Sequence, residues 1–323
     1  MKTKKSLLGI AARGLAMGAA DVVPGVSGGT IAFITGIYDQ LLKSISAFDL
    51  SLINLFKQEG LKAVWTKVNG NFLASLFLGI GISIISLSKL LGGLLQSHPH
   101  QLWSFFLGLI IASIIYMGKQ IPKLTIKSIL GIILGTAIVL SLSILPPLGN
   151  STSLIYIFVC GMIAISAMIL PGISGSFLLL ILGVYQTVIG AISELNLAIL
   201  GVFALGCIVG LLSFSRVLKW VFEKHNSITL SVLTGFLVGS IYKLWPWRHV
   251  EQIFVKHLGE PKEEVVNLVD SPVLPGNYDE IIRVKEQITG YISIEPDVIQ
   301  CIVLAIIGFS LIFIMERFAN KSF

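Results

Sequence analysis

Two stretches of apolar sequence carry the same unusual phrase of proline, glycine and serine. The first reads VPGVSGG over 23–29, and the second reads LPGISGS over 170–176. Proline and glycine break a helix, and a break inside the hydrocarbon frees backbone N–H and C=O groups that lipid cannot satisfy. Such breaks persist where they are buried in protein or line a cavity, and in transporters they form the substrate site.

The chemistry that these two tips offer is anion binding. A helix that begins after Pro-Gly directs its free N–H groups and its positive dipole end at the break, and glycines let the backbone approach a ligand. Two such ends near the bilayer midplane form an anion site, for which phosphate is the best fit. The predicted phosphate-binding residues are Pro24, Gly25, Ser27, Gly28, Gly29 and Thr30 in the first tip and Pro171, Gly172, Ser174, Gly175 and Ser176 in the second. The alternative is that Pro-Gly only shapes a turn and the glycines allow close helix packing.

Charged residues inside the first apolar arm are further candidates. Arg13, Met17 and Asp21 follow each other at intervals of four and therefore share one face of a helix. Arg13 is a candidate phosphate ligand, and Asp21 is a candidate orienting or proton-carrying group, because charges inside a membrane usually face cavities. The alternative for Asp21 is an internal ion pair that closes the hairpin.

Three other charged residues are candidates for a head-group vestibule or for coupling. Lys89 and Arg216 occupy matching positions near the ends of two apolar spans, where they either line a vestibule or extend to the membrane surface. Glu194 follows the second hairpin where the first has Ala47, and is either a coupling group or a loop residue. Tyr38 and Tyr185 also match, and aromatic anchoring at the membrane surface explains them.

The two phrases belong to an internal repeat. Residues 24–50 align without gaps on 171–197, and farther on Leu78-Gly79, Gly108 and His98 pair with Leu205-Gly206, Gly235 and His225. The change of offset indicates an insertion near 51–71 in the first half. The sequence therefore predicts two equivalent halves. They are 1–148, with a hairpin at 7–42 and three transmembrane helices, and 149–323, with a hairpin at 153–192, three transmembrane helices and an acidic outer loop at 245–297.

Composition places the chain in a membrane. Hydrophobic residues make up 54% and charged residues 12% of the 323 residues, and mean hydropathy is +0.89. That leaves too little polar surface for a soluble globule of this size. The three cysteines fall in apolar spans without metal-ligand spacing, and the net charge of +6 comes from short loops beside apolar spans. We therefore expect no metal, no cofactor and no nucleic-acid partner; the sequence does not reveal an oligomeric state.

Hydropathy and charge give the topology. Six spans are long enough to cross a bilayer, at 72–95, 102–118, 128–146, 197–218, 228–244 and 298–316. The two phrase-bearing hairpins are expected to be re-entrant, although full crossing gives the same parity. With both termini in the cytoplasm, every short loop that contains lysine or arginine lies inside. The loops predicted to lie outside contain neither residue; they are 96–101, 147–152 and 193–196. The fold class is thus an all-α integral membrane protein with an inverted-topology repeat.

The phrases ADVVPGVSGGT at 20–30, followed by GIY at 36–38, and LPGISGS at 170–176, followed by GVY at 183–185, resemble those of the PopT family of polyprenyl-phosphate translocases. The resemblance covers nearly the whole chain except 245–297. It implies a multi-pass protein of the bacterial plasma membrane that returns undecaprenyl phosphate from the outer to the cytoplasmic leaflet. The lipid carrier is then recycled for peptidoglycan and other envelope polymers. The residues themselves indicate only an anion site in an inverted-repeat transporter.

Two alternatives stay open at this point. A transporter of a small soluble anion would use the same tips. A membrane lipid phosphatase would need His, Arg and carboxylates converging on a phosphate, yet the five histidines lie in predicted loops without metal or nucleophile spacing. The sequence therefore favours a transporter over an enzyme, and leaves the driving force open.

Overall fold

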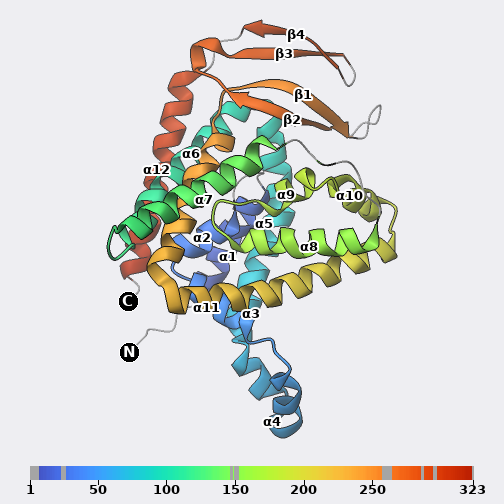
Figure 1. Ribbon diagram of the computed structural model, residues 1–323, viewed down its shortest axis with the longest axis vertical. Coiled ribbons are helices and arrows are strands. Elements are labelled where there is room, and N and C mark those ends of the chain that lie inside the picture. Colours follow the sequence, from blue (N-terminus) through green and yellow to red (C-terminus); the bar gives the residue numbers. More distant parts are fainter. Residues whose placement is uncertain are drawn as a thin grey trace.

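The structure is a computed structural model that describes residues 7–22, 27–145, 148, 153–256, 264–284, 287–293 and 297–321. Most of this part of the chain is helical (Figure 1). The elements are α1 (Leu7–Val22), α2 (Gly28–Ile34), α3 (Tyr38–Ser46), α4 (Ser51–Lys67), α5 (Gly70–Ser97), α6 (Pro99–Lys119), α7 (Ile126–Ile144), α8 (Leu154–Ile169), α9 (Gly175–Ile181), α10 (Tyr185–Ser193), α11 (Leu197–Leu244), β1 (Arg248–Lys256), β2 (Glu264–Pro272), η1 (Pro275–Asn277), β3 (Asp279–Val284), β4 (Gln287–Ser293) and α12 (Val298–Lys321). The chain is a multi-pass, essentially all-α membrane protein, as the sequence predicts.

The two phrase-bearing regions have the same backbone. α2 and α9 each have seven residues and begin at equivalent glycines, and α3 and α10 each have nine residues and begin at equivalent tyrosines. Between them, Gly36 and Gly183 have φ values of 66° and 68°, a left-handed conformation that glycine adopts without a Cβ penalty. The sequence repeat is therefore a repeat of structure down to single backbone angles.

The second arm of each hairpin is bent rather than straight. α9 and α10 meet at 112°, which identifies a broken span or a re-entrant loop. A helix of seven residues is about 10 Å long, a third of the hydrocarbon thickness. These arms thus fit the expected re-entrant hairpins better than full crossings. The sequence signal for the bend is the GIY and GVY pair at 36–38 and 183–185.

The six predicted spans correspond to α5, α6, α7, two parts of α11, and α12. α11 contains a break at His225, with φ −134° and ψ 45°, and His98 separates α5 from α6 with φ −141° and ψ 56°. These two histidines are repeat equivalents. By length and apolarity, four helices of the described chain, α5, α6, α7 and the whole of α11, can each cross a membrane, and the bent α9–α10 pair is a fifth candidate.

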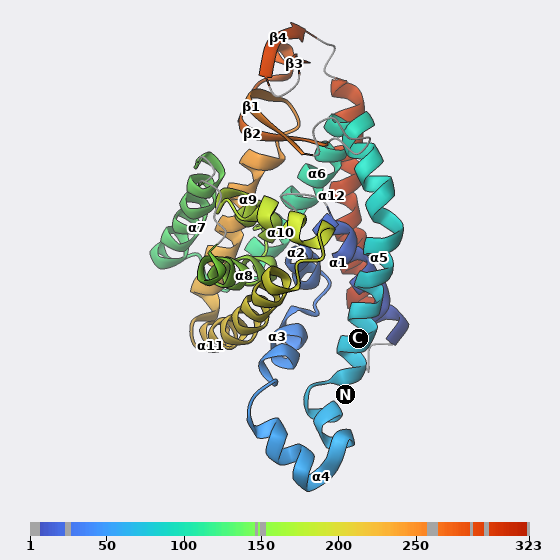
Figure 2. The same ribbon diagram turned by 90° about the vertical axis from the view of Figure 1, so that its right-hand side faces the viewer.

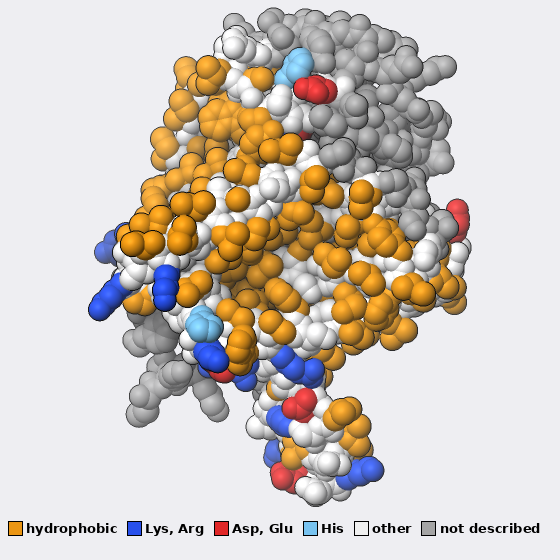
Figure 3. Space-filling view, in the orientation of Figure 1, with side chains coloured by type: hydrophobic (Ala, Val, Ile, Leu, Met, Phe, Trp, Pro, Cys, Tyr) orange, Lys and Arg blue, Asp and Glu red, His pale blue; other side chains and the backbone are white. Residues whose placement is uncertain are grey.

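The surface is that of a protein solvated by lipid. Large hydrophobic side chains are exposed along α5, α7, α8, α11 and α12. In Figure 3 they cover much of the face shown, and the lysine and arginine side chains coloured in this view lie along its lower edge and on α4. A broad apolar surface of this kind is typical of a membrane protein.

In each half, a glycine lets the first helix of the hairpin pack closely on the long helix that follows the hairpin. On α1, a Cβ at Gly14 would overlap the carbonyl oxygen of Leu76 on α5. The equivalent pair in the second half is Gly161 on α8 against Phe203 on α11. Small residues allow helices to approach this closely in membranes.

The last helix of each predicted half packs on the other half. α7 lies against the part of α11 after His225, where a Cβ at Gly135 would overlap the carbonyl oxygen of Val232. α12 lies in the same way against α6, where Gly108 faces Ala305 (Figures 1 and 2). The two sequence halves are consequently interlocked rather than separate bodies.

The acidic segment 245–297, predicted as an outer loop, contains strands. β1 pairs with β2 and β3 pairs with β4, each antiparallel, to form two two-stranded sheets at the end of the molecule opposite α4. Val and Ile alternate with polar residues in several parts of this segment, which favours strands. The predicted insertion near 51–71 corresponds to α4, which is broken at Gly60 and projects from the body (Figure 2).

Candidate functional site

The two tips meet inside the molecule. The hydroxyl of Ser27 lies 3.1 Å from the carbonyl oxygens of both Met168 and Leu170, and it accepts a hydrogen bond from the N–H of Gly29, also at 3.1 Å. Ser27 is 1% exposed. The first tip therefore binds the end of α8 through a buried hydroxyl. Pro24 and Gly25, which the sequence assigns to this tip, lie outside the described residues.

Two more hydroxyls join the tips. The N–H of Gly172 donates to Oγ1 of Thr30 at 3.2 Å, and the hydroxyl of Tyr38 donates to the carbonyl of Ile169 at 3.0 Å. Thr30 is fully buried and Tyr38 is 2% exposed. The interpretation of Tyr38 as an anchor at the membrane surface is thus wrong, because the α3 backbone turns its ring inward, beside Phe33 and Phe222.

The meeting point lies midway along a membrane-spanning segment. Gly172 packs against the backbone of Phe236 and Leu237, near the middle of the part of α11 that runs from His225 to Leu244. Pro171, Gly172 and Ser174 are buried at this depth. Breaks at this depth are tolerated because they lie within protein.

Asp21 caps the helix of the first tip. Its Oδ1 accepts a hydrogen bond from the N–H of Gly28 at 2.7 Å, at the N-terminus of α2. A carboxylate there interacts favourably with the helix dipole. The protein's own anion therefore occupies one of the positions at which the sequence predicts phosphate. Among the salt bridges of the described residues, none joins Asp21 to Arg13.

Arg13 lies farther from the tips. Its Nη1 donates to the carbonyl of Gly9, one turn back in α1, at 3.0 Å. Eight residues separate Arg13 from Asp21, which is about 12 Å along a helix. The two share a face of α1 as predicted, but Arg13 lies nearer the start of the helix than the break.

The second tip is built differently. Ser174 is the N-cap residue of α9 but makes no capping hydrogen bond, and its hydroxyl lies 3.0 Å from that of Ser176. Gly175 packs against Ala164 and Met168, and Gly29 in the first tip packs against Ile169. Gly29 and Gly175 thus allow close helix packing, which is the alternative that the sequence left open for these glycines. The serines and Thr30 supply hydroxyl groups.

The three residues assigned to a vestibule or to coupling are dispersed. Arg216 is exposed, and its guanidinium donates to the carbonyl of Phe48 after α3. Glu194 is exposed at the C-terminus of α10. Lys89 lies in α5. Arg216 and Glu194 thus lie away from the tips, and the described part of the structure shows no group of three potential metal ligands.

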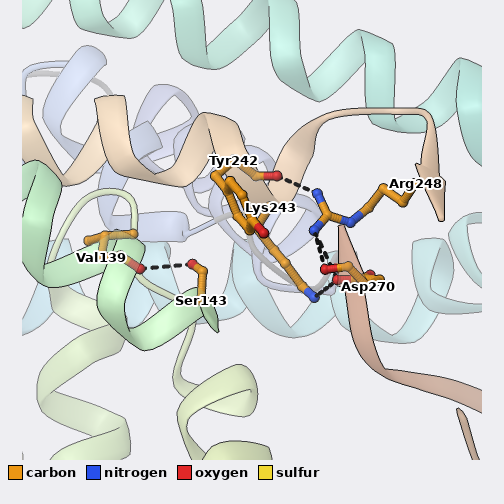
Figure 4. A network of polar contacts seen from close by, with 6 residues as sticks. All are labelled: Val139, Ser143, Tyr242, Lys243, Arg248 and Asp270. Atoms are coloured by element: carbon orange, nitrogen blue, oxygen red, sulfur yellow. Dashed lines mark hydrogen bonds and ion pairs between the residues drawn. The ribbon is translucent and has the colours of Figure 1, made fainter. Parts of the chain in front are cut away.

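A cluster that the sequence did not reveal lies at the end of α11 (Figure 4). Oδ1 of Asp270 on β2 lies 2.9 Å from Nζ of Lys243 and 2.9 Å from Nη2 of Arg248. Lys243 also lies over the ring of Phe177 on α9, with its Nζ 5.3 Å from the ring centroid. Lys243 and Arg248 are close in the sequence, but Asp270 reaches them only because the β1–β2 hairpin pairs its two strands.

Comparison with known proteins identifies the family of this chain. A family described as VCA0040-like, undecaprenyl phosphate translocase-like, matches residues 17–262. The chain belongs to this family. It is 48% identical over 248 residues to a protein of Vibrio cholerae named polyprenyl-phosphate transporter, covering 77% of this chain and 80% of the relative. A Staphylococcus aureus protein of the same name is 37% identical over 252 residues, or 72% of this chain and 84% of the relative. Both are named as transporters rather than enzymes, and no solved structure matches.

Proposed function

We propose that this protein transports a polyprenyl phosphate, in a bacterium undecaprenyl phosphate, from the outer to the cytoplasmic leaflet of the plasma membrane. The released carrier then returns to the synthesis of peptidoglycan and other envelope polymers. The names of two relatives that match more than 70% of the chain support this substrate. Its multi-pass architecture suits a substrate that is itself part of the membrane.

The physical task is to move a charged head group while its tail stays in hydrocarbon. Taking a phosphate out of water costs several kcal/mol unless donors replace its hydration shell. The buried hydroxyls of Ser27 and Thr30 and the paired hydroxyls of Ser174 and Ser176 are donors at the place where the two tips meet. Arg13 is a further donor on the approach along α1.

The observation that carries the proposal is that tips from opposite halves are hydrogen-bonded to each other at mid-depth. Ser27 and Thr30 bind backbone groups of the second tip, at Met168, Leu170 and Gly172. A phosphate oxygen can replace a carbonyl as the partner of the Ser27 hydroxyl, and it can take the N–H of Gly172 from Thr30. When the substrate binds, hydrogen bonds between the two tips would thus be replaced by hydrogen bonds to its phosphate.

The interlocked helices suggest which parts move. α6, α7, the second part of α11 and α12 hold each other across the two halves. The hairpin units α1–α3 with α5, and α8–α10 with the first part of α11, connect to this scaffold at His98 and His225, where the helical backbone is interrupted. We place the hinges of alternating access at these two equivalent breaks, and both chain termini in the cytoplasm.

Proteoliposomes that contain undecaprenyl phosphate test the proposal. A phosphatase added outside removes phosphate only from the outer leaflet, so about half of the lipid resists it unless a protein moves lipid across. We expect the wild type to make nearly all of the lipid accessible. Thr30→Val and the double variant Ser27→Ala/Ser174→Ala should slow this at least tenfold, because each lost hydrogen bond to a charged group is worth about 1.5–3 kcal/mol.

The matched control is Ser86→Ala, which removes an exposed hydroxyl that bonds only to its own helix, at Ile82. It should transport like the wild type. Lipid that stays half-protected with the wild type, with or without an imposed proton gradient, would contradict the proposal. Uptake of radioactive inorganic phosphate by the same vesicles would then favour a soluble-anion transporter.

A further inference from the structure

The cluster at the end of α11 combines two cations with one carboxylate. The side chains of Lys243, Arg248 and Asp270 are 20%, 11% and 6% exposed. Both cations bind the same oxygen, Oδ1 of Asp270. Burial opposes ionisation of Asp270, but Lys243 and Arg248 hold the pKa of this carboxyl below its usual value. The cluster therefore places two basic side chains and one acidic side chain together in a largely buried position.

The donors of this cluster exceed its acceptors. Nη1 of Arg248 donates to the carbonyl of Tyr242, and Nη2 donates to the carbonyl of Asp270 at 3.2 Å. The Nε of Arg248 is buried without a hydrogen-bond partner. The lysine ammonium has three N–H groups, one of which Asp270 accepts. A phosphate, with three strong acceptor oxygens and a higher charge, satisfies such a pair better than a single carboxylate oxygen does.

The cluster lies on the way to the second tip. Lys243 contacts the ring of Phe177, which follows Ser176 on α9. It is six residues, or about 9 Å, along α11 from Leu237, against which Gly172 packs. A head group bound by Lys243 is thus within one short step of the tip hydroxyls.

The pair has no counterpart in the first half. By the repeat offset of 127 residues, Lys243 corresponds to Tyr116 and Arg248 to Ile121. The feature is therefore not a by-product of the duplicated fold. It belongs to the side of the molecule that carries the β-hairpins, which the charge pattern places outside.

We propose that Lys243 and Arg248 form a docking site for the phosphate group of the lipid on the β-hairpin side, and that Asp270 occupies this site until the lipid displaces it. The inference rests on the proposed function and extends it to the entry step. The β1–β2 hairpin then acts as an internal competitor, because its carboxylate must leave the two cations before the head group reaches α9.

Binding of farnesyl phosphate to the full-length protein in detergent micelles tests this docking site by calorimetry. Asp270→Asn keeps the shape of the side chain and removes its charge, so the affinity should rise about tenfold. Lys243→Met and Arg248→Gln should each lower it about tenfold, whereas Lys243→Arg keeps the charge and should retain most of it. Opposite signs for the acidic and basic variants are the expected result.

The competing explanation is that the three residues only clamp the hairpin to α11. Loss of either charge would then lower the thermal midpoint, and Asp270→Asn would weaken binding or leave it unchanged. That result overturns the docking site. The exposed pair Lys67–Asp49, 3.5 Å apart at the other end of the molecule, provides matched controls: Asp49→Asn and Lys67→Met should not change the affinity.

Two further probes separate the sources of the phosphate. Inorganic phosphate should displace farnesyl phosphate only at much higher concentration, and farnesol should not bind at the cluster. Equal affinity for inorganic and farnesyl phosphate would assign the pair to a soluble anion and overturn a lipid dock. If the wild type moves undecaprenyl phosphate in vesicles but Asp270→Asn does not tighten binding, the docking site fails while the proposed function stands.

Discussion

The two tips share a backbone but differ in charge. α2 and α9 have the same length, the same serine at the N-cap and the same left-handed glycine at the end. The first tip, however, has Asp21 on its helix N-terminus, and the equivalent position in the second is Met168. The first tip thus neutralises itself, whereas the second has Lys243 beside Phe177. Duplication conserved the shape of the breaks and not their electrostatics.

This difference bears on how an inverted repeat moves an anion. If the two tips were identical, the inward-open and outward-open states would have equal energy, because exchanging the conformations of the two halves converts one state into the other. A carboxylate on one tip and cations beside the other remove that equality. We therefore expect the empty protein to favour one access state, with the cationic side receiving the anion.

Exchanging the second residue of each short helix gives the largest expected effect. Gly29 and Ser176 are repeat equivalents, yet a Cβ on Gly29 would overlap the carbonyl oxygen of Ile169, whereas Ser176 is only half-buried. Gly29→Ser should lower the free energy of unfolding by about 3 kcal/mol through overpacking. Ser176→Gly should cost less than about 1 kcal/mol. Reversible unfolding in an SDS titration measures both.

The control for this exchange is Gly81→Ala on α5, where a Cβ meets nothing within 4 Å. It should leave stability unchanged or raise it slightly. Equal costs for Gly29→Ser and Ser176→Gly would show that the two tips pack alike and would remove the structural basis of the comparison.

Giving the first tip the residue of the second should have a smaller effect. Asp21→Met removes the carboxylate that accepts from the N–H of Gly28. The loss of a charged N-cap partner should cost about 1–2 kcal/mol in unfolding free energy. Glu59→Gln, at an exposed position on α4 away from the first turn of that helix, is the control and should cost less than about 0.5 kcal/mol. A variant as stable as the wild type would mean that Asp21 does not cap α2 in the membrane.

Much of the fold was predictable because the membrane restricts it. Apolar length predicted six spans, of which α5, α6, α7 and α11 are long and apolar enough to cross a membrane, and the gap-free alignment of 24–50 with 171–197 placed the breaks in equivalent positions. The bends at Gly36 and Gly183 were not predicted, although the GIY and GVY motifs recur at these positions. The strands of 245–297 were missed because hydropathy identifies long apolar helices and carries no signal for short paired strands.

The candidate site was predictable in its residue types and not in its partners. Serines and glycines at the tips pointed to donors at mid-depth, yet the bond from Tyr38 to Ile169 spans 131 residues and depends on how α3 turns. Lys243 and Asp270 likewise come together only through the β1–β2 hairpin. Contacts between segments far apart in sequence follow from packing, which no local pattern encodes.

The N-cap serines provide the finest test of the comparison between tips. Ser27 accepts from Gly29 and reaches the carbonyls of Met168 and Leu170, so Ser27→Ala leaves buried polar groups unpaired and should cost about 1–2 kcal/mol in SDS unfolding. Ser174 bonds to the hydroxyl of Ser176, which can turn to another partner. Ser174→Ala should therefore cost about 0.5 kcal/mol or less. The sum of the two single-variant costs should equal the cost of the double variant Ser27→Ala/Ser174→Ala if the tips act independently. A difference of about 1 kcal/mol between the sum and the measured cost would mean that each serine stabilises the opposite tip as well as its own.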